Sequence, residues 1–333
     1  SDTKIKKTSF VMEEIDIAQL KKLSILIKPS NLKSFLNNKI KNGKMDTEIE
    51  IFLNEKGKLK NFIAKGKVKN LKAELFKDLN LSKTNLNFFA DKNDVLIKNI
   101  FGNLEDIKIS EGDVKLNFEN GIKLNSNFSS LIDLNENLVS KYTRFLGKSK
   151  TLGKVDFITA NLNNNIYIHL DSTYKIKDYK YSFSGKIEDI KLRLFKPIKN
   201  DLITEKIEKL FIKNFNMKTI FTPKKISYKG EGKYSFNDLD FYEINFINDI
   251  NNDLINLKLD FNYGNSLELD FINYKKSHNS TANFSLNLEK NKETFIVNSL
   301  KYNEQDNLVE IDGLKLKKNE FFSFKKIRVL TSN

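Results

Sequence analysis

Apolar residues recur at every second position along most of this chain. In the segment 257–261 two leucines and a phenylalanine alternate with a lysine and an aspartate, and similar stretches follow one another from Met45 to the C-terminal end. A period of two puts the apolar side chains on one face of a β-strand and the charged ones on the other. The sequence therefore predicts an all-β fold of mostly antiparallel strands, with one apolar side and one wet side.

The composition is that of an ordered protein. Hydrophobic residues make up 39% of the 333 residues and charged residues 30%, with only 3 Pro and 13 Gly. This length accommodates one to three domains, and no Pro/Gly/Ser-rich linker interrupts the chain. The absence of Cys excludes a disulfide framework and thiolate-bound zinc, but it does not identify a compartment.

The net charge of +14 raises the question of a nucleic-acid partner. Only Arg144, Arg193 and Arg328 are arginines, and the lysines are spread over many strands without forming a block. This pattern argues against nucleic acid, and it is typical of a solvated outer face or of attraction to anionic membranes. No apolar run approaches the roughly 18 to 20 residues that cross a bilayer. Because the sequence begins with Ser1, we expect it to be a segment of a longer protein.

The apolar spacing divides the chain into four sections. Residues 1–44 are expected to form a helical lead-in, with a helix that begins after Pro29 and ends at Asn42-Gly43. Residues 45–133 read as a first β-section, 134–150 as an amphipathic helical insert, and 151–333 as a second β-section with a short helix near 201–213. Asn120-Gly121 predicts a tight hairpin. Turns near Gly264-Asn265 and 277–280 are expected to continue the meander through a strand at 267–271.

The residues that carry enzyme chemistry are sparse. His169 lies in a strand pattern with its side chain expected outward, and His278 lies in a polar segment, so neither a metal site nor a catalytic triad is indicated. Carboxylate pairs such as Glu48 with Glu50 fit a solvated face, and Gly230-Glu231-Gly232 lies in a strand pattern instead of preceding a helix. We therefore predict no enzyme activity, no metal and no cofactor.

Several segments resemble those of a known family. The proline-led helix of 28–41 with Asn42-Gly43 before a strand, the run Ile-Lys-Ile-Ser-Glu-Gly-Asp-Val at 107–114, and the Ile-Asp-Gly step at 311–313 occur in the same order in AsmA-like proteins of Gram-negative bacteria. That superfamily includes the TamB and YhdP types. The chain departs from the family pattern where Phe35 replaces the tryptophan of the first helix, and the family's membrane anchor is not in this sequence.

The resemblance implies a long, curved β-groove, taco-like or solenoid-like, with two or three short amphipathic helices. It also implies a periplasmic segment, anchored in the inner membrane elsewhere in the protein, that conducts phospholipids toward the outer membrane. On this interpretation the groove is lined by residues of one strand parity: Ile49, Ile51, Phe88, Val95, Ile97, Val114, Leu116, Phe118, Ile122, Leu124, Phe157, Ile168, Phe183, Leu257, Phe261, Leu269 and Leu286.

Residues of the other parity are expected to face water: Glu48, Glu50, Lys115, Lys258, Asp260 and Glu268. Two alternatives stay open at this point. A structural or adhesive β-solenoid or sandwich would show the same alternation around a closed core without a ligand. An enzyme of lipid or polysaccharide metabolism would need a focused polar site in the sheet.

Overall fold

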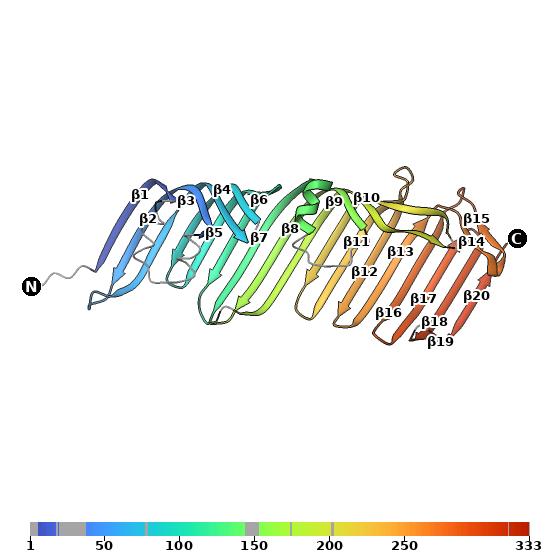
Figure 1. The fold of residues 1–333 in the computed structure, drawn as a ribbon. Coiled ribbons are helices and arrows are strands. Elements are labelled where there is room, and N and C mark those ends of the chain that lie inside the picture. The colour runs from blue at the N-terminus through green and yellow to red at the C-terminus, as the bar shows by residue number, and fades with distance from the viewer. Residues whose placement is uncertain are drawn as a thin grey trace, which may run out of the picture. The chain divides into compact units, whose positions relative to one another are not determined.

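The protein is all-β and folds as two compact units. The computed structural model describes residues 6–17, 19, 38–76, 79–143, 153–173, 175–200, 203–318 and 320–332. Unit 1 comprises Ser1–Ile132 and Asn163–Tyr181, and unit 2 comprises Asp133–Leu162 and Ser182–Asn333. Eighteen strands belong to one open antiparallel sheet, and a separate hairpin forms a second, two-stranded sheet (Figure 1).

The strands pair in chain order, as in a meander. Unit 1 contains β1 (Lys7–Asp16), β2 (Ile40–Leu53), β3 (Leu59–Phe76), β4 (Leu79–Asp91), β5 (Asp94–Leu104), β6 (Ile107–Asn117) and most of β7 (Ile122–Asn135). Two long strands, β8 (Gly153–Leu170) and β9 (Ile176–Asn200), have residues in both units.

Unit 2 adds the remaining strands and two short helices of the described part of the chain. They are α3 (Glu136–Thr143), β10 (Ile203–Phe221), β11 (Lys225–Ser235), β12 (Tyr242–Asn251), β13 (Leu254–Tyr263), β14 (Leu267–Leu269), the 3₁₀ helix η2 (Asp270–Ile272), β15 (Tyr274–Lys276), β16 (Ala282–Lys290), β17 (Thr294–Glu304), β18 (Asn307–Lys317), β19 (Glu320–Ser323) and β20 (Lys326–Leu330). Helix α3 lies within the segment predicted as a helical insert.

The predicted hairpin at Asn120-Gly121 is confirmed. Both residues have positive φ, 58° and 105°, and the flanking strands β6 and β7 pair from Asn117 with Lys123 onward. Two successive positive φ values match the twist of a tight hairpin, and Asn-Gly adopts them at low steric cost.

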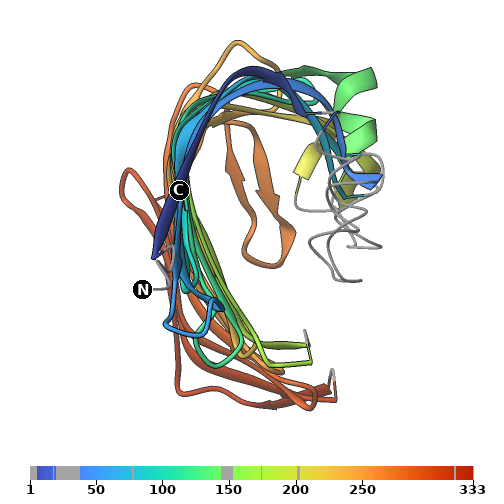
Figure 2. The same ribbon diagram turned by 90° about the vertical axis from the view of Figure 1, so that its left-hand side faces the viewer.

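Bulges bend the strands of unit 1 at regular places. Three residues with left-handed φ lie where the pairing registers shift or are interrupted, and each donates its backbone N–H to a side-chain oxygen on the next strand. These bonds run from Glu14 to Asp46 Oδ1 (2.8 Å), from Asn70 to Asn85 Oδ1 (3.0 Å) and from Asn99 to Asp113 Oδ1 (3.1 Å). A bulge bends its strand and increases the local twist, and Figure 2 shows the strands bending along their length.

The prediction for the N-terminal section, residues 1–44, is partly wrong. Residues 7–16 form strand β1 instead of a helical lead-in, and β2 begins at Ile40 instead of Met45. Phe10 pairs with Ile49, and Lys7 donates to Glu50 at 2.7 Å, so the N-terminal segment is held as an added strand. The helix expected after Pro29 lies outside the described residues.

The helix predicted near 201–213 is also wrong, because the described residues 203–213 belong to strand β10. Its apolar residues fit a helical stripe, yet Phe211 to Phe221 pair with β11, and Ile207, Phe211 and Phe215 are buried. Backbone pairing with a neighbouring strand and burial of the same side chains outweigh helix propensity here.

The meander predicted through 267–271 is wrong as well. Strand β13 pairs directly with β16, from Ile255 with Lys290 to Tyr263 with Ala282. The segment between them forms the β14–β15 hairpin, which closes through η2 and the left-handed residue Asn273 (φ 51°). Figure 2 shows this hairpin lying against the concave side of the bent strands of unit 2.

Candidate functional site

Unit 1 has one apolar sheet face, which follows from its pairing registers. Directly paired residues of antiparallel strands lie on the same face. Ile49 pairs with Ala64 and Ile51 with Phe62; the next pairs across the strands are Gly66 with Phe88, Phe88 with Ile97, Val95 with Leu116, Ile97 with Val114, and Leu116 with Leu124. We call this set, from Ile49 to Leu124, the apolar face of unit 1.

The reverse face of unit 1 carries cross-strand ion pairs. Lys65 Nζ lies 2.9 Å from Glu48, and Lys69 Nζ lies 3.1 Å from Asp46. The hydrogen bond with Glu48 raises the pKa of Lys65 above its usual value. Glu48, Glu50 and Lys115 lie on this face, where charge is solvated at little cost.

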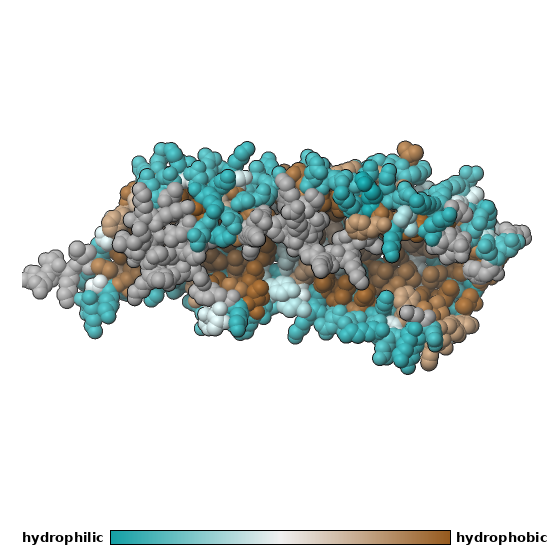
Figure 3. Space-filling model, viewed as in Figure 1, coloured by the Kyte–Doolittle hydropathy of each residue, from teal (hydrophilic) through white to brown (hydrophobic). Residues whose placement is uncertain are grey.

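Unit 2 contains an apolar pocket of about 500 Å³ on its sheet. Strands β9 to β13 and β16 and the β14–β15 hairpin form its walls, and Figure 3 shows hydrophobic side chains gathered over the strands between β11 and β18, bordered by hydrophilic ones. The pocket is lined by Ile198, Ile203, Ile207, Leu210, Ile212, Phe215, Tyr234, Phe236, Ile244, Phe246, Leu259, Phe261, Tyr263, Leu267 and Phe284.

The two tyrosines in this lining have their hydroxyl groups bonded to the protein backbone. Tyr234 donates to the Asn262 carbonyl at 2.7 Å, and Tyr263 donates to the Ser266 carbonyl at 3.3 Å. Burial raises the pKa of Tyr263 to about 12. Since the remaining lining side chains are hydrocarbon, the pocket suits a ligand part that makes no hydrogen bonds.

Two glycines make room for one wall of the pocket. A Cβ at Gly230 or Gly232 would lie 2.3 Å or 2.8 Å from ring atoms of Phe215, which lies in a bulge of β10. The Phe215 ring stacks on that of Phe246, with 5.9 Å between centroids. Gly230-Glu231-Gly232 therefore has a packing role in this unit.

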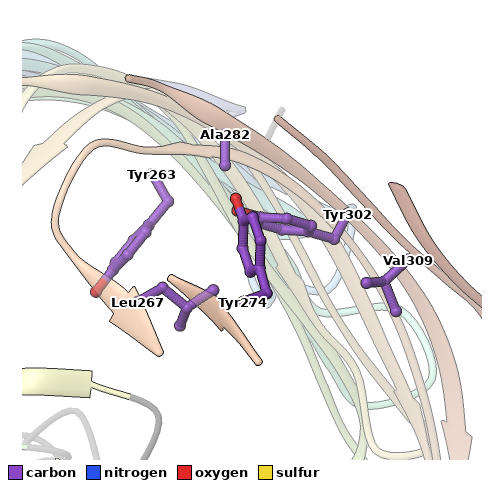
Figure 4. Close-up of a cluster of buried hydrophobic side chains, with 6 residues drawn as sticks. All are labelled: Tyr263, Leu267, Tyr274, Ala282, Tyr302 and Val309. Atoms are coloured by element: carbon purple, nitrogen blue, oxygen red, sulfur yellow. The ribbon is translucent and has the colours of Figure 1, made fainter. Parts of the chain in front are cut away.

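The β14–β15 hairpin is fixed to the sheet by a cluster of buried hydrophobic side chains. Its members are Tyr263, Leu267, Tyr274, Ala282, Tyr302 and Val309, shown in Figure 4. Tyr274 and Tyr302 share a hydrogen bond of 2.6 Å between their hydroxyls, and Tyr274 also donates to Glu304 at 2.8 Å. Burial favours the protonated carboxyl of Glu304, but hydrogen bonds from Ser280, Tyr274 and Asn307 outweigh it and hold its pKa below the usual value.

Lys276 closes the base of the same hairpin. Its side chain is 1% exposed, and Nζ donates to the carbonyls of Gly264 (2.8 Å), Asn265 (3.0 Å) and Ser277 (2.9 Å). Burial lowers the pKa of Lys276. The hairpin is thus tied at both ends, by the tyrosine pair and by this lysine.

The structure brings together many of the residues predicted to line a groove. In unit 1, Ile49, Ile51, Phe88, Val95, Ile97, Val114, Leu116 and Leu124 share the apolar face, with Ile122 at the start of β7 and Phe118 just beyond the end of β6. In unit 2, Leu257, Phe261 and Leu286 share one face through the pairs Leu257 with Leu288, Leu259 with Leu286, and Phe261 with Phe284.

The other predicted residues are placed separately. Phe157 and Ile168 lie in β8, and Phe183 lies in β9 with its ring 6.5 Å from that of Phe221. Leu269 lies in the inserted hairpin, paired with Tyr274, and not in a strand of the main sheet. Of the residues expected to face water, Lys258 pairs with Ile247 and Asp260 with Asn245 on the reverse face, and Glu268 forms an ion pair with Lys275 in the hairpin.

Sequence reasoning missed the residues that form most of the pocket wall, above all Tyr234, Phe246 and Phe215. The spacing of Gly230 and Gly232 in a strand was a usable signal, because glycines inside a strand mark a close approach. His278, expected in a polar segment, contacts Glu205 at 2.9 Å.

The described residues contain no group of His, Cys, Asp or Glu arranged to hold a metal ion. None of the helices in the described part of the chain is long and apolar enough to cross a membrane. Comparison with protein families, with curated proteins and with solved structures finds no match for this chain.

Proposed function

We propose that this chain is the periplasmic segment of a lipid-transport bridge. It would shield phospholipid acyl chains in an apolar β-groove between the inner and outer membranes, in a protein held to the inner membrane by a segment outside this sequence. The proposal assigns phospholipids as ligands, the two membranes as partners through other parts of the protein, and neither catalytic activity nor a cofactor to this chain.

The observation that supports the proposal most strongly is the pocket of unit 2. Its lining is hydrocarbon apart from the hydroxyls of Tyr234 and Tyr263, which donate hydrogen bonds to backbone carbonyls. The reverse face of the same sheet carries Lys258 and Asp260. A sheet with an apolar pocket on one face and charged residues on the other is suited to a ligand with a long apolar part.

The energetics explain why such a surface is needed. An acyl chain of about sixteen carbons gains on the order of 12 kcal/mol on leaving water, at roughly 0.8 kcal/mol per CH₂. A lipid that crosses an aqueous space without cover faces that barrier. An apolar sheet face lowers it by replacing the membrane interior along the way.

The test uses photo-crosslinking amino acids at matched neighbouring positions. Leu116 and Lys115 are compared in unit 1, and Leu259 and Lys258 in unit 2, because each pair differs only in the sheet face it occupies. We expect lipid adducts at Leu116 and Leu259 and few at the two lysines. Equal adducts within each pair would contradict the proposal.

The buried cluster around the β14–β15 hairpin favours one alternative, a structural or adhesive β-protein with a closed core. There the apolar faces would be filled by the protein's own side chains and take no ligand. Native mass spectrometry of the purified protein separates the two functions, since only a lipid carrier retains phospholipid. Hydrolysis of a lipid by the same preparation would instead revive the enzyme hypothesis.

A further inference from the structure

The segment that follows β18 exposes three phenylalanines within four residues. Phe321 and Phe322 lie in the short strand β19 and are 61% and 60% exposed, and Phe324, just after it, is 50% exposed. The rings of Phe321 and Phe324 are 6.1 Å apart. We call Phe321, Phe322 and Phe324 the aromatic tip. Large apolar side chains that gather while half or more of their surface is exposed to water mark an interaction surface.

The aromatic tip is apolar on both faces of the sheet. Phe321 pairs with Leu316, whereas Phe322 is the unpaired residue where the register shifts, and its ring lies by the side chain of Lys315, which points to the face opposite Leu316. An apolar groove on one side of the sheet would account for the exposure of Phe321 but not for that of Phe322. Exposure on both sides favours insertion of the whole tip into an apolar medium over packing of one face against a partner.

Neighbouring turns at the same edge of unit 2 lack this feature. The turn between β12 and β13 consists of Asn252 and Asp253, and the one between β16 and β17 contains Asn291, Lys292 and Glu293. Phenylalanines are therefore not a general property of the turns on this edge.

Positive charge surrounds the aromatic tip. The segment 315–328 contains six basic residues and one acidic residue, Glu320. Lys315 Nζ lies 5.2 Å from the centre of the Phe322 ring, and among the described basic residues of the segment only Lys326 has an ion pair, with Glu310 at 3.7 Å. Lysines also protect sheet edges from aggregation, but that role does not account for exposed aromatic rings beside them.

We propose that the aromatic tip and its basic neighbours dock this protein onto an anionic lipid bilayer. The phenylalanines would enter the boundary between head groups and acyl chains, and the lysines would contact lipid phosphates. Each basic residue near an anionic surface strengthens binding roughly fivefold. The proposal goes beyond the lipid groove and does not depend on it, because the aromatic tip shares no residue with the pocket of unit 2.

Tryptophan fluorescence tests this proposal directly, because the chain has no Trp of its own. The variant Phe322→Trp is mixed with vesicles of phosphatidylcholine alone and with vesicles that also contain phosphatidylglycerol. We expect a blue shift of the emission with the anionic vesicles only, and its reversal by salt. The control Phe195→Trp, at an exposed phenylalanine in β9, is expected to show no shift.

Charge reversal provides the second arm of the test. Lys317→Glu combined with Lys318→Glu is expected to weaken vesicle binding of the Phe322→Trp protein at least tenfold. Lys56→Glu with Lys58→Glu, in the exposed turn between β2 and β3, changes the net charge equally and should leave binding unchanged. No shift with either vesicle, an equal shift with neutral vesicles, or a concentration-dependent shift without vesicles, which would indicate self-association, would each overturn the proposal.

Discussion

The two units build their apolar faces from the same strand pattern but fill them differently. The face of unit 1 contains small residues, Ala64, Gly66 and Ala90, between aliphatic ones such as Ile97, and most of these side chains are only partly buried. Unit 2 instead carries stacked aromatic rings, including Phe261 over Phe284 at 4.9 Å, and the inserted β14–β15 hairpin. Alternation thus specifies that a face is apolar, whereas insertions and side-chain size decide how much of it is closed.

The largest expected effect distinguishes the buried cluster of unit 2 from the half-exposed apolar face of unit 1. Tyr302 is 2% exposed, so Tyr302→Ala should lower the free energy of unfolding by about 3–5 kcal/mol, through loss of packing and of its hydrogen bond. Ile97→Ala, on the apolar face of unit 1, should lower the free energy of unfolding by only about 1–2 kcal/mol. Urea denaturation measures both, with Tyr302→Phe as the variant that keeps the packing. Equal losses for Tyr302→Ala and Ile97→Ala would remove the distinction between the units.

A second test addresses how the hairpin is held. Lys276→Met leaves three carbonyls without their donor, that of Gly264 in a buried contact, and should lower the free energy of unfolding by about 2–3 kcal/mol. The adjacent exposed Lys275, which pairs with Glu268, is the matched control. Lys275→Met should leave the denaturation midpoint unchanged, and a loss as large as that of Lys276→Met would show that the buried contacts are not the cause.

The third test uses pH. The pKa of Glu304 is lowered in the folded protein, so its ionised form contributes stability above the ordinary value of 4.5, and this contribution is lost as pH falls below that value. We expect thermal scans of the wild type to show a steeper loss of stability in acid than scans of Glu304→Gln. In unit 1, hydrogen bonds from Lys39 also lower the pKa of Glu74, but this carboxylate is solvated, so Glu74→Gln should flatten the acid profile less.

The smallest effect is expected on the reverse face of unit 1. Lys65 and Glu48 form an exposed ion pair, and such pairs contribute little because water and salt screen them. Lys65→Ala should leave both the denaturation midpoint and any lipid crosslinking at Leu116 unchanged. A clear loss of crosslinking would mean that this face takes part in ligand binding.

The comparison also shows where sequence reasoning succeeds. Local pattern was sufficient for the all-β class, for the Asn120-Gly121 hairpin and for the common face of Ile49, Phe88 and Leu116. The apolar spacing of 201–213 predicts a helix, and only the pairing of β10 with its neighbour shows that the described residues 203–213 form a strand. Segment 267–271 has the alternation of a sheet strand, yet Asn273 turns the chain back after three paired residues.

By itself, the sequence determined the period of two and therefore which side chains share a face, because successive residues of a strand point in opposite directions. It did not determine the bulges, the hairpin packed on unit 2 or the pocket beside it. Those depend on contacts between residues far apart in the chain, such as Tyr274 with Tyr302 and Phe215 with Gly230, whose energies act only after the strands have paired.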